Sequence, residues 1–135
     1  MSEIILQVDG TNYAGWTAVS VSRSIETVAG VFDLTCTENV GGAAAQWPLR
    51  PNQKCKILVN GQTVIDGYID KVSIAVSDSA HGIAVSGRDK TGDLVDCAAV
   101  HSPAQWRNIK LLDLVKILAA PFGLEVILET VADTP

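Results

Sequence analysis

The chain has 135 residues, of which 47% are hydrophobic, and it carries a net charge of −5. This length allows one domain, or one domain and the start of another, with a hydrophobic core that needs neither disulfides nor metals. The acidic balance and the lack of clustered Lys and Arg exclude a nucleic-acid surface, because phosphate binding needs clustered cations.

Apolar and polar side chains alternate with period two in four segments of the first half of the chain. These segments are residues 4–8, 19–25, 32–36 and 55–59. Period two is typical of strands that have one face in water and the other in a core. In the second segment Val19, Val21 and Ile25 fall on one face, and we expect them to share it in the strand.

Residues 39–52, between the third and fourth predicted strands, are rich in Gly and Ala and then carry the run WPLRP. A loop of this length is unusual unless it is functional or flexible. We expect it to project and to contact a neighbouring subunit. Trp47, Leu49 and Arg50 are the candidate interface residues, since aromatic anchors concentrate binding energy.

The pair Asn60-Gly61 is the strongest local signal in the sequence, because both residue types tolerate the positive φ angles of a tight hairpin turn. It predicts a hairpin from the preceding strand to a long strand at residues 63–77. Gly67 lies inside that strand and indicates a bulge or sharp bend. Hairpins joined in this way, with a bent strand among them, predict a mainly β fold built on a small antiparallel β-barrel.

The run GRDKTGDLVDC at residues 87–97 is the most distinctive in the chain. Its aspartates, Asp89, Asp93 and Asp96, do not match a calcium loop, which needs oxygen ligands at alternating positions and a closing Glu. We therefore expect a structural role, in which a strand ends at Gly87 and turns into a short helical turn.

Thr91 or Asp93 is expected to cap this helical turn, since a side-chain oxygen can accept a hydrogen bond from a free backbone N–H group. Leu94 and Val95 would then close one end of the barrel.

A single clear helix is predicted near residues 109–119, where apolar residues recur at helical spacing after a possible N-cap, Asn108. A short strand is predicted at residues 124–128. A helix and a strand make a poor domain by themselves. We therefore expect the barrel to occupy residues 1–100, and residues 101–135 to be a linker and the start of a second, truncated domain.

The sequence offers no convincing catalytic set. His81 and His101 lack the spacing of a metal site. Asp66 and Asp70 could be imagined as the paired carboxylates of a hydrolase, but acids at this spacing are common on solvated strand faces, and we interpret them in that way. We expect no enzyme activity, no metal and no cofactor.

Cys36, Cys55 and Cys97 are too widely spaced for a disulfide framework, so they are interpreted as reduced thiols made in a cytoplasm. The N-terminus lacks the basic region of a secretory signal, and no apolar stretch is long enough for a transmembrane helix.

Several short motifs follow one another along the chain. They are YAGW at 13–16, VSVSRSI at 19–25, AGVF at 29–32, WPLRP at 47–51, DGYID at 66–70 and GRDKTGDLVDC at 87–97, followed by Trp106 and PFG at 121–123. In this order they resemble the N-terminal part of the baseplate hub proteins of Mu-like contractile-tailed phages and prophages.

The resemblance implies a structural protein that forms a homotrimer. Each subunit of such a hub contributes two related β-barrels to a pseudo-sixfold ring, which adapts the sixfold tail tube to the threefold spike. The implied partners are further copies of the chain, the tail tube proteins and the tail spike protein. The implied location is the tail baseplate of the virion, after synthesis in the host cytoplasm.

Two alternatives remain open. The N-terminal part of a type VI secretion spike has a related fold, and a C-terminal β-helical needle in the full-length sequence would identify it. A barrel that binds glycans or oligonucleotides would need aromatic and basic residues on one strand face, whereas Ser, Thr and Val dominate the faces here.

Overall fold

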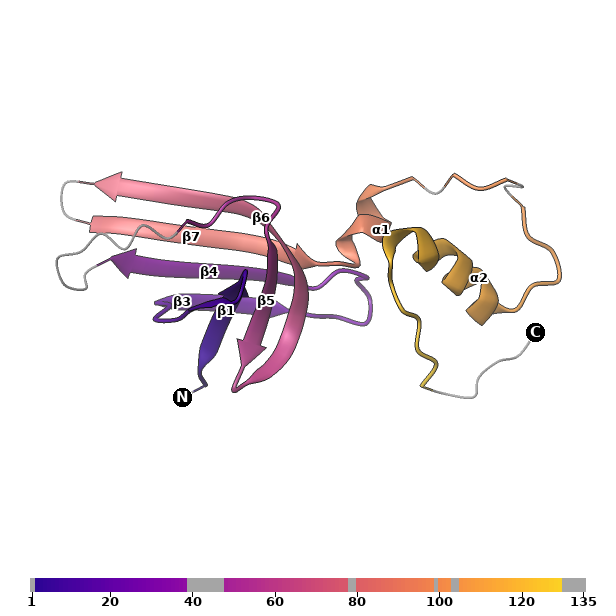
Figure 1. The fold of residues 1–135 in the computed structure, drawn as a ribbon, viewed down its shortest axis with the longest axis horizontal. Coiled ribbons are helices and arrows are strands. Elements are labelled where there is room, and N and C mark those ends of the chain that lie inside the picture. Colours follow the sequence, from indigo (N-terminus) through magenta and orange to yellow (C-terminus); the bar gives the residue numbers. More distant parts are fainter. Residues whose placement is uncertain (1, 39–47, 78–79, 99, 103–104, 130–135) are drawn as a thin grey trace. The chain divides into compact units, whose positions relative to one another are not determined.

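The computed structural model describes residues 2–38, 48–77, 80–98, 100–102 and 105–129. The chain divides into two compact units, Met1–Gly92 and Asp93–Pro135. The first unit is built from strands and the second from helices (Figure 1). The predicted mainly β fold with a following helix is confirmed.

One antiparallel sheet of seven strands makes up the first unit. Its strands are β1 (Ile4–Val8), β2 (Thr11–Tyr13), β3 (Ala18–Ser22), β4 (Val31–Glu38), β5 (Lys54–Val59), β6 (Gln62–Ser77) and β7 (Ala80–Asp89). Their order in the sheet is β2-β1-β5-β6-β7-β4-β3. Figure 1 shows β6 bending strongly, so that β1 and β5 cross over the long strands β4 and β7 and give a barrel-like shape.

The bend in β6 coincides with two bulges and one close approach. Val64 and Asp70 are the extra residues where the register with β5 and with β7 shifts. Gly67 lies between them, where a Cβ atom would sit 1.9 Å from the carbonyl oxygen of Arg88. Gly67 is thus needed for close strand contact, and the bulges lie three residues to either side of it.

Gly87 performs a similar role in β7. A Cβ atom there would lie 2.2 Å from the carbonyl oxygen of Tyr68 and 2.7 Å from the ring of Phe32. The absence of a side chain therefore lets the Phe32 ring and the β6 backbone both approach β7.

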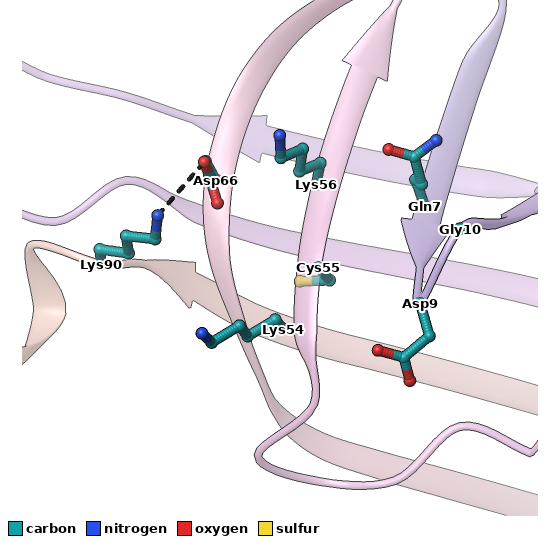
Figure 2. Close-up of a pocket in the computed structure, with 8 residues that line it drawn as sticks. All are labelled: Gln7, Asp9, Gly10, Lys54, Cys55, Lys56, Asp66 and Lys90. Atoms are coloured by element: carbon teal, nitrogen blue, oxygen red, sulfur yellow. Dashed lines mark hydrogen bonds and ion pairs between the residues drawn. The ribbon is translucent and has the colours of Figure 1, made fainter.

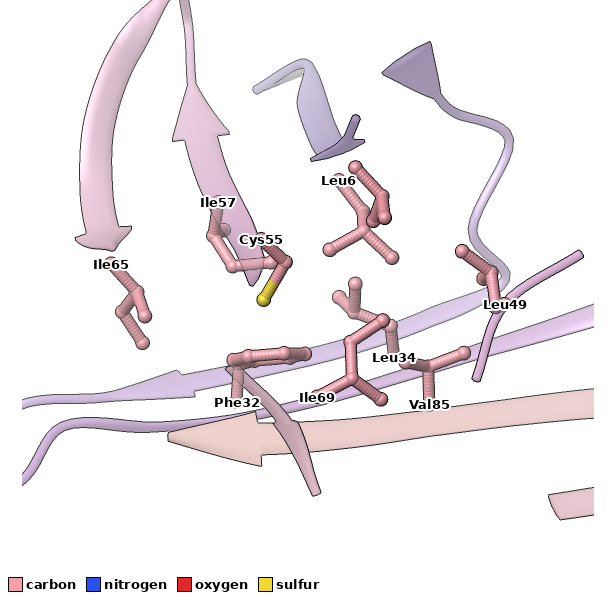
Figure 3. Close-up of a cluster of buried hydrophobic side chains, with 10 residues drawn as sticks. Leu6, Phe32, Leu34, Leu49, Cys55, Ile57, Ile65, Ile69 and Val85 are labelled. Carbon is pink, nitrogen blue, oxygen red and sulfur yellow. The ribbon is translucent and has the colours of Figure 1, made fainter. Parts of the chain in front are cut away.

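The core lies inside the curled sheet and consists of small and medium apolar side chains around one aromatic ring. Its members are Leu6, Val8, Phe32, Leu34, Leu49, Cys55, Ile57, Ile65, Ile69 and Val85. Figure 3 shows Leu6, Cys55 and Ile57 from β1 and β5 facing Phe32 and Leu34 from β4. The crossing of the two halves of the sheet therefore closes the core.

Two features of the sheet differ from the sequence prediction. The short strand β2 has no counterpart among the predicted elements, because three residues are too few to show a period. β3 ends at Ser22, and Ile25 lies in the loop to β4 with its side chain fully exposed. The prediction that Ile25 shares a strand face with Val19 and Val21 is therefore wrong.

The second unit contains α1 (Gly92–Asp96), which begins at the unit boundary, α2 (Leu111–Ala119) and the 3-10 turn η1 (Ala120–Phe122). Lys110 rather than Asn108 is the N-cap residue of α2, and no side chain caps the helix. Asn108 has a φ of 53°, so it belongs to the preceding turn. The predicted helix is confirmed, whereas its predicted cap is wrong.

Residues 124–129 form no regular secondary structure, so the predicted strand at 124–128 is wrong. An alternating apolar pattern becomes a strand only when a neighbouring strand supplies hydrogen-bond partners. Among the described residues of this unit, no strand does so. Within the described ranges, no helix is long and apolar enough to cross a membrane.

Candidate functional site

The turn after β7 is organised around the carboxylate of Asp89. One of its oxygens accepts a hydrogen bond from the backbone N–H of Gly30 at 2.8 Å. The other accepts from the backbone N–H of Thr91 at 3.1 Å and from the Thr91 hydroxyl. The hydroxyl also lies 2.6 Å from the carbonyl oxygen of Val28. Asp89 therefore fastens the loop between β3 and β4 to the end of β7.

The sequence pattern offered Thr91 or Asp93 as the cap of the helical turn, whereas in the structure the Thr91 hydroxyl bonds to Asp89 and to the carbonyl oxygen of Val28. The side chain of Asp93 is exposed, and its backbone carbonyl oxygen accepts the N–H of Cys97 at 3.0 Å. Val95 is 60% exposed, so it does not close an end of the barrel as expected. The local pattern marks where the chain turns, but it does not show which aspartate meets a loop that is distant in sequence.

The two carboxylates considered as a hydrolase pair each have a basic partner. Arg88 Nε donates to Asp70 Oδ2 at 2.7 Å, and Lys90 Nζ donates to Asp66 Oδ2 at 3.4 Å. All four side chains are partly open to solvent, so each ion pair contributes about 1 kcal/mol or less. Their separate partners favour a structural role for both acids.

The predicted interface residues fall in different surroundings. Trp47 lies outside the described residues. Leu49 is 7% exposed and belongs to the core of the sheet. Arg50 is exposed, and its backbone N–H donates to Gln53 Oε1 at 2.7 Å. Contact of this segment with a neighbouring subunit stays a prediction. The side chain of Leu49 packs in the core of its own unit.

The turn between β5 and β6 has the geometry that its residues allow. Asn60 has a φ of 50° and Gly61 a φ of 81°, and Val59 pairs directly with Gln62. The Asn60 side chain also accepts a hydrogen bond from the backbone N–H of Glu3 at 2.9 Å. The turn therefore joins β5 to β6 and also binds the backbone of Glu3 near the start of the chain.

A hollow of about 330 Å³ lies over β1, β5 and β6 (Figure 2). Its charged lining residues are Lys54, Lys56, Lys90, Asp9 and Asp66. Figure 2 shows the lysines of β5 beside the Asp66–Lys90 ion pair. The lining is mixed in charge and open, and it presents no set of groups arranged for proton transfer or nucleophilic attack.

Cys55 lies below this hollow, with its side chain in the core. Burial, and then the negative charges of Asp66 and Asp70, raise the pKa of the Cys55 thiol to about 12. The thiol is therefore protonated and unreactive near neutral pH. Among the described residues, no group of His, Cys, Asp and Glu is placed to hold a metal ion.

The first unit is thus an antiparallel sheet whose turns are held by side-chain hydrogen bonds. Comparison with known proteins shows the family to which this sheet belongs. Residues 3–89 match the family model described as Mu phage baseplate assembly protein GpP-like, N-terminal. Residues 91–135 match the model described as baseplate hub protein gp44-like, second domain.

The chain belongs to the family of Mu-type baseplate hub proteins. It is 44% identical, over 123 residues, to the baseplate hub protein gp44 of Escherichia phage Mu. The match covers 91% of this chain and 32% of the Mu protein, so the chain spans about a third of the length of that relative. The family resemblance of the ordered motifs is confirmed.

Two solved structures have the same fold. The 43 kDa tail protein of prophage MuSo2 from Shewanella oneidensis matches with a TM-score of 0.85 and 38% identity, over 96% of this chain and 40% of that chain. The tail protein from Neisseria meningitidis MC58 matches with a TM-score of 0.76 and 26% identity, over 89% of this chain and 33% of that chain.

Proposed function

We propose that this chain is a structural, non-catalytic part of the baseplate hub in the tail of a Mu-like phage or prophage. In its full-length parent it would form a homotrimer that links the tail tube to the central spike. The observation that carries the proposal is the match of residues 3–89 to the baseplate assembly domain, together with 44% identity to the Mu hub protein.

The side chains of the first unit support a structural role. The polar groups of the GRDKTGD run bind to other parts of the same unit: Arg88 to Asp70, Asp89 to Gly30 and Lys90 to Asp66. Groups that are used in this way stabilise a rigid shape and are not placed to attack a substrate. A rigid shape is what a component of a ring-shaped adaptor needs.

The partners of the proposed hub are further copies of the chain, tail tube proteins and a spike protein. Its proposed location is the virion baseplate, after synthesis in the bacterial cytoplasm. The segment around Trp47 and Arg50 is a proposed contact with a neighbour, through the exposed Arg50 side chain and the adjacent residues.

The test is to express the full-length parent and determine its mass by sedimentation and its shape by electron microscopy. We expect a trimeric ring that co-purifies with the spike and tube proteins encoded beside it. A monomer that binds neither protein would overturn the proposal. A C-terminal β-helical needle in the full-length parent would assign the chain to a secretion spike instead.

A further inference from the structure

The hollow over β1, β5 and β6 brings together three lysines from two segments that are distant in sequence. Lys54 and Lys56 belong to β5, and Lys90 follows the end of β7. The chain as a whole is acidic, with 10 Lys and Arg against 15 Asp and Glu. Three of the ten cations therefore meet at one surface, although the sequence shows no cationic cluster.

The two β5 lysines point away from the core. Lys54 and Lys56 are exposed, whereas Cys55 and Ile57 between and beyond them are buried. Residues two apart on a strand lie on the same face, about 6.7 Å apart along it. The strand therefore holds two ammonium groups next to each other at the floor of the hollow.

The carboxylate between the lysines does not neutralise them all. Asp66 lies opposite Lys56 in the pairing of β5 with β6, yet its Oδ2 binds Lys90 Nζ at 3.4 Å. Figure 2 shows the three lysines around Asp66. Neither Lys54 nor Lys56 has an ion-pair partner among the described residues. An excess of positive charge therefore remains in the hollow.

The walls of the hollow are held by hydrogen bonds. On one side, Asp9 and Gly10 form a turn with φ angles of 50° and 81°, and Asp9 Oδ2 accepts from Gln53 Nε2 at 3.3 Å. On the other side, the backbone N–H of Lys90 donates to the carbonyl oxygen of Asp66 at 3.1 Å. The lysines thus meet in a preformed space of about 330 Å³, and preformed sites lose less freedom on binding.

We propose that this hollow is the docking site for an extended acidic segment of a different tail protein, with Asp or Glu at alternate positions. Alternate side chains of an extended segment are also about 6.7 Å apart on one face. Two carboxylates in that arrangement can each meet one β5 lysine, and ion pairs across an interface fix its register. The inference rests on the proposed function, in which the chain assembles with other tail proteins.

The 135 residues of this chain do not supply such a segment. No two of its 15 acidic residues lie two positions apart in the sequence. Adjacent or more widely spaced carboxylates would not match two lysines on the same face of one strand. We therefore assign the acidic segment to another protein and not to a further copy of this unit.

A nucleic-acid strand is the competing ligand, because its phosphates are also anionic. Binding of a phosphate chain uses cations along a continuous track, whereas only three lysines gather here. Asp9 and Asp66 also line the hollow and would repel phosphates that continue past the lysines. A short segment with two carboxylates fits the available charge better.

The direct test is to titrate the isotope-labelled 135-residue chain with a peptide of alternating Glu and Thr and to follow its backbone N–H groups by NMR. We expect the largest shifts at residues 54–56 and at Lys90. A peptide of the same composition with consecutive Glu residues should bind about threefold more weakly, because only one carboxylate can meet a lysine. Absence of shifts at residues 54–56, or equal binding of the two peptides, would overturn the inference.

Charge removal tests the lysines themselves. Lys54→Gln and Lys56→Gln should each weaken binding of the alternating peptide about threefold, since each removes one exposed ion pair. Lys71→Gln is the matched control, because Lys71 is also an exposed strand lysine and lies outside the hollow. Circular dichroism checks that each variant is folded. An equal loss in Lys71→Gln would mean that binding follows net charge alone and would contradict the proposed site.

A single-stranded oligothymidine is the second probe for the same N–H groups. We expect it to bind more weakly than the alternating peptide at equal ionic strength. Tighter binding of the oligonucleotide at residues 54–56 would assign the hollow to nucleic acid and refute the proposal.

The full-length parent, assembled with its tail neighbours, separates this inference from the proposed function. A carbodiimide joins an amine to a carboxylate that touches it, and mass spectrometry locates the linked residues. We expect Lys54 or Lys56 to be joined to an acidic segment of another protein. A trimeric ring without this link, or with a link only to the hub sequence, would overturn the inference and leave the function. If the peptide binds but the parent binds no tail protein, the function fails and the acidic-ligand site stands.

Discussion

The two ends of the long strands β6 and β7 have similar alternating patterns but very different surroundings. At one end Ile69 is fully buried, and Gly67 and Gly87 let two backbones and the Phe32 ring come into close contact. At the other end Ile74 is 68% exposed. An alternating pattern therefore specifies which face of a strand is apolar, whereas the curl of the sheet decides which part of that face is covered.

Gly67→Ala should destabilise the crowded end of β6 and β7 more than any other substitution considered. The new methyl group would lie 1.9 Å from the Arg88 carbonyl oxygen, and a backbone atom in β7 cannot move aside easily. We expect a loss of about 4 kcal/mol or more in the free energy of unfolding, enough to prevent folding of a marginally stable unit. Urea denaturation followed by circular dichroism measures it.

Gly82→Ala is the control for this substitution. Gly82 lies toward the open end of β7, and the nearest atom to its added Cβ would be 3.9 Å away. We expect a change of about 0.5 kcal/mol or less. A similar loss in both variants would show that the two ends are equally crowded.

A pair of isoleucine variants compares the two ends directly. Ile69→Ala removes a buried side chain and leaves a cavity, so it should lower the free energy of unfolding by about 3 kcal/mol. Ile74→Ala removes a side chain that is already mostly in water, and should cost about 0.5 kcal/mol or less in the monomer. Equal costs at low protein concentration would mean that Ile74 is buried within its own chain.

Asp89→Ala should have a smaller effect than loss of the core isoleucine. It leaves the N–H groups of Gly30 and Thr91 without their acceptor, which costs about 2 kcal/mol. Hydrogen exchange at Gly30 should accelerate, because the loop before β4 loses its attachment. Asp93→Ala, at an exposed position, should change neither quantity, and equal effects in the two variants would refute the role assigned to Asp89.

The effect expected from Cys55 is absent near neutral pH and appears only at alkaline pH. Its pKa is about 12 in the folded chain, against 9.0 for an unperturbed thiol. The unfolded state therefore loses this proton first, and stability should fall as pH rises from 9 toward 12. Cys55→Val should show a shallower fall in the urea midpoint over this range. Parallel curves for the two proteins would contradict the burial of the thiol.

Much of the fold was predictable from local pattern. Period-two alternation located β1, β4, β5 and β6, and helical spacing located α2. These signals depend on which side chains neighbour each other along one element, and that information is contained in the sequence. The ordered motifs also led to the correct family, because several short runs in a fixed order are specific when taken together.

The contacts between distant segments were decided by the tertiary structure alone. The attachment of the loop before β4 to Asp89 was not predicted, because the approach of Gly30 to the end of β7 has no local signature. For the same reason Ile25 is exposed in a loop, Leu49 is buried, and Gly67 marks a strand contact flanked by bulges. Residue type and spacing determined the elements of this chain, and the curl of the sheet determined which of their surfaces remain open for assembly.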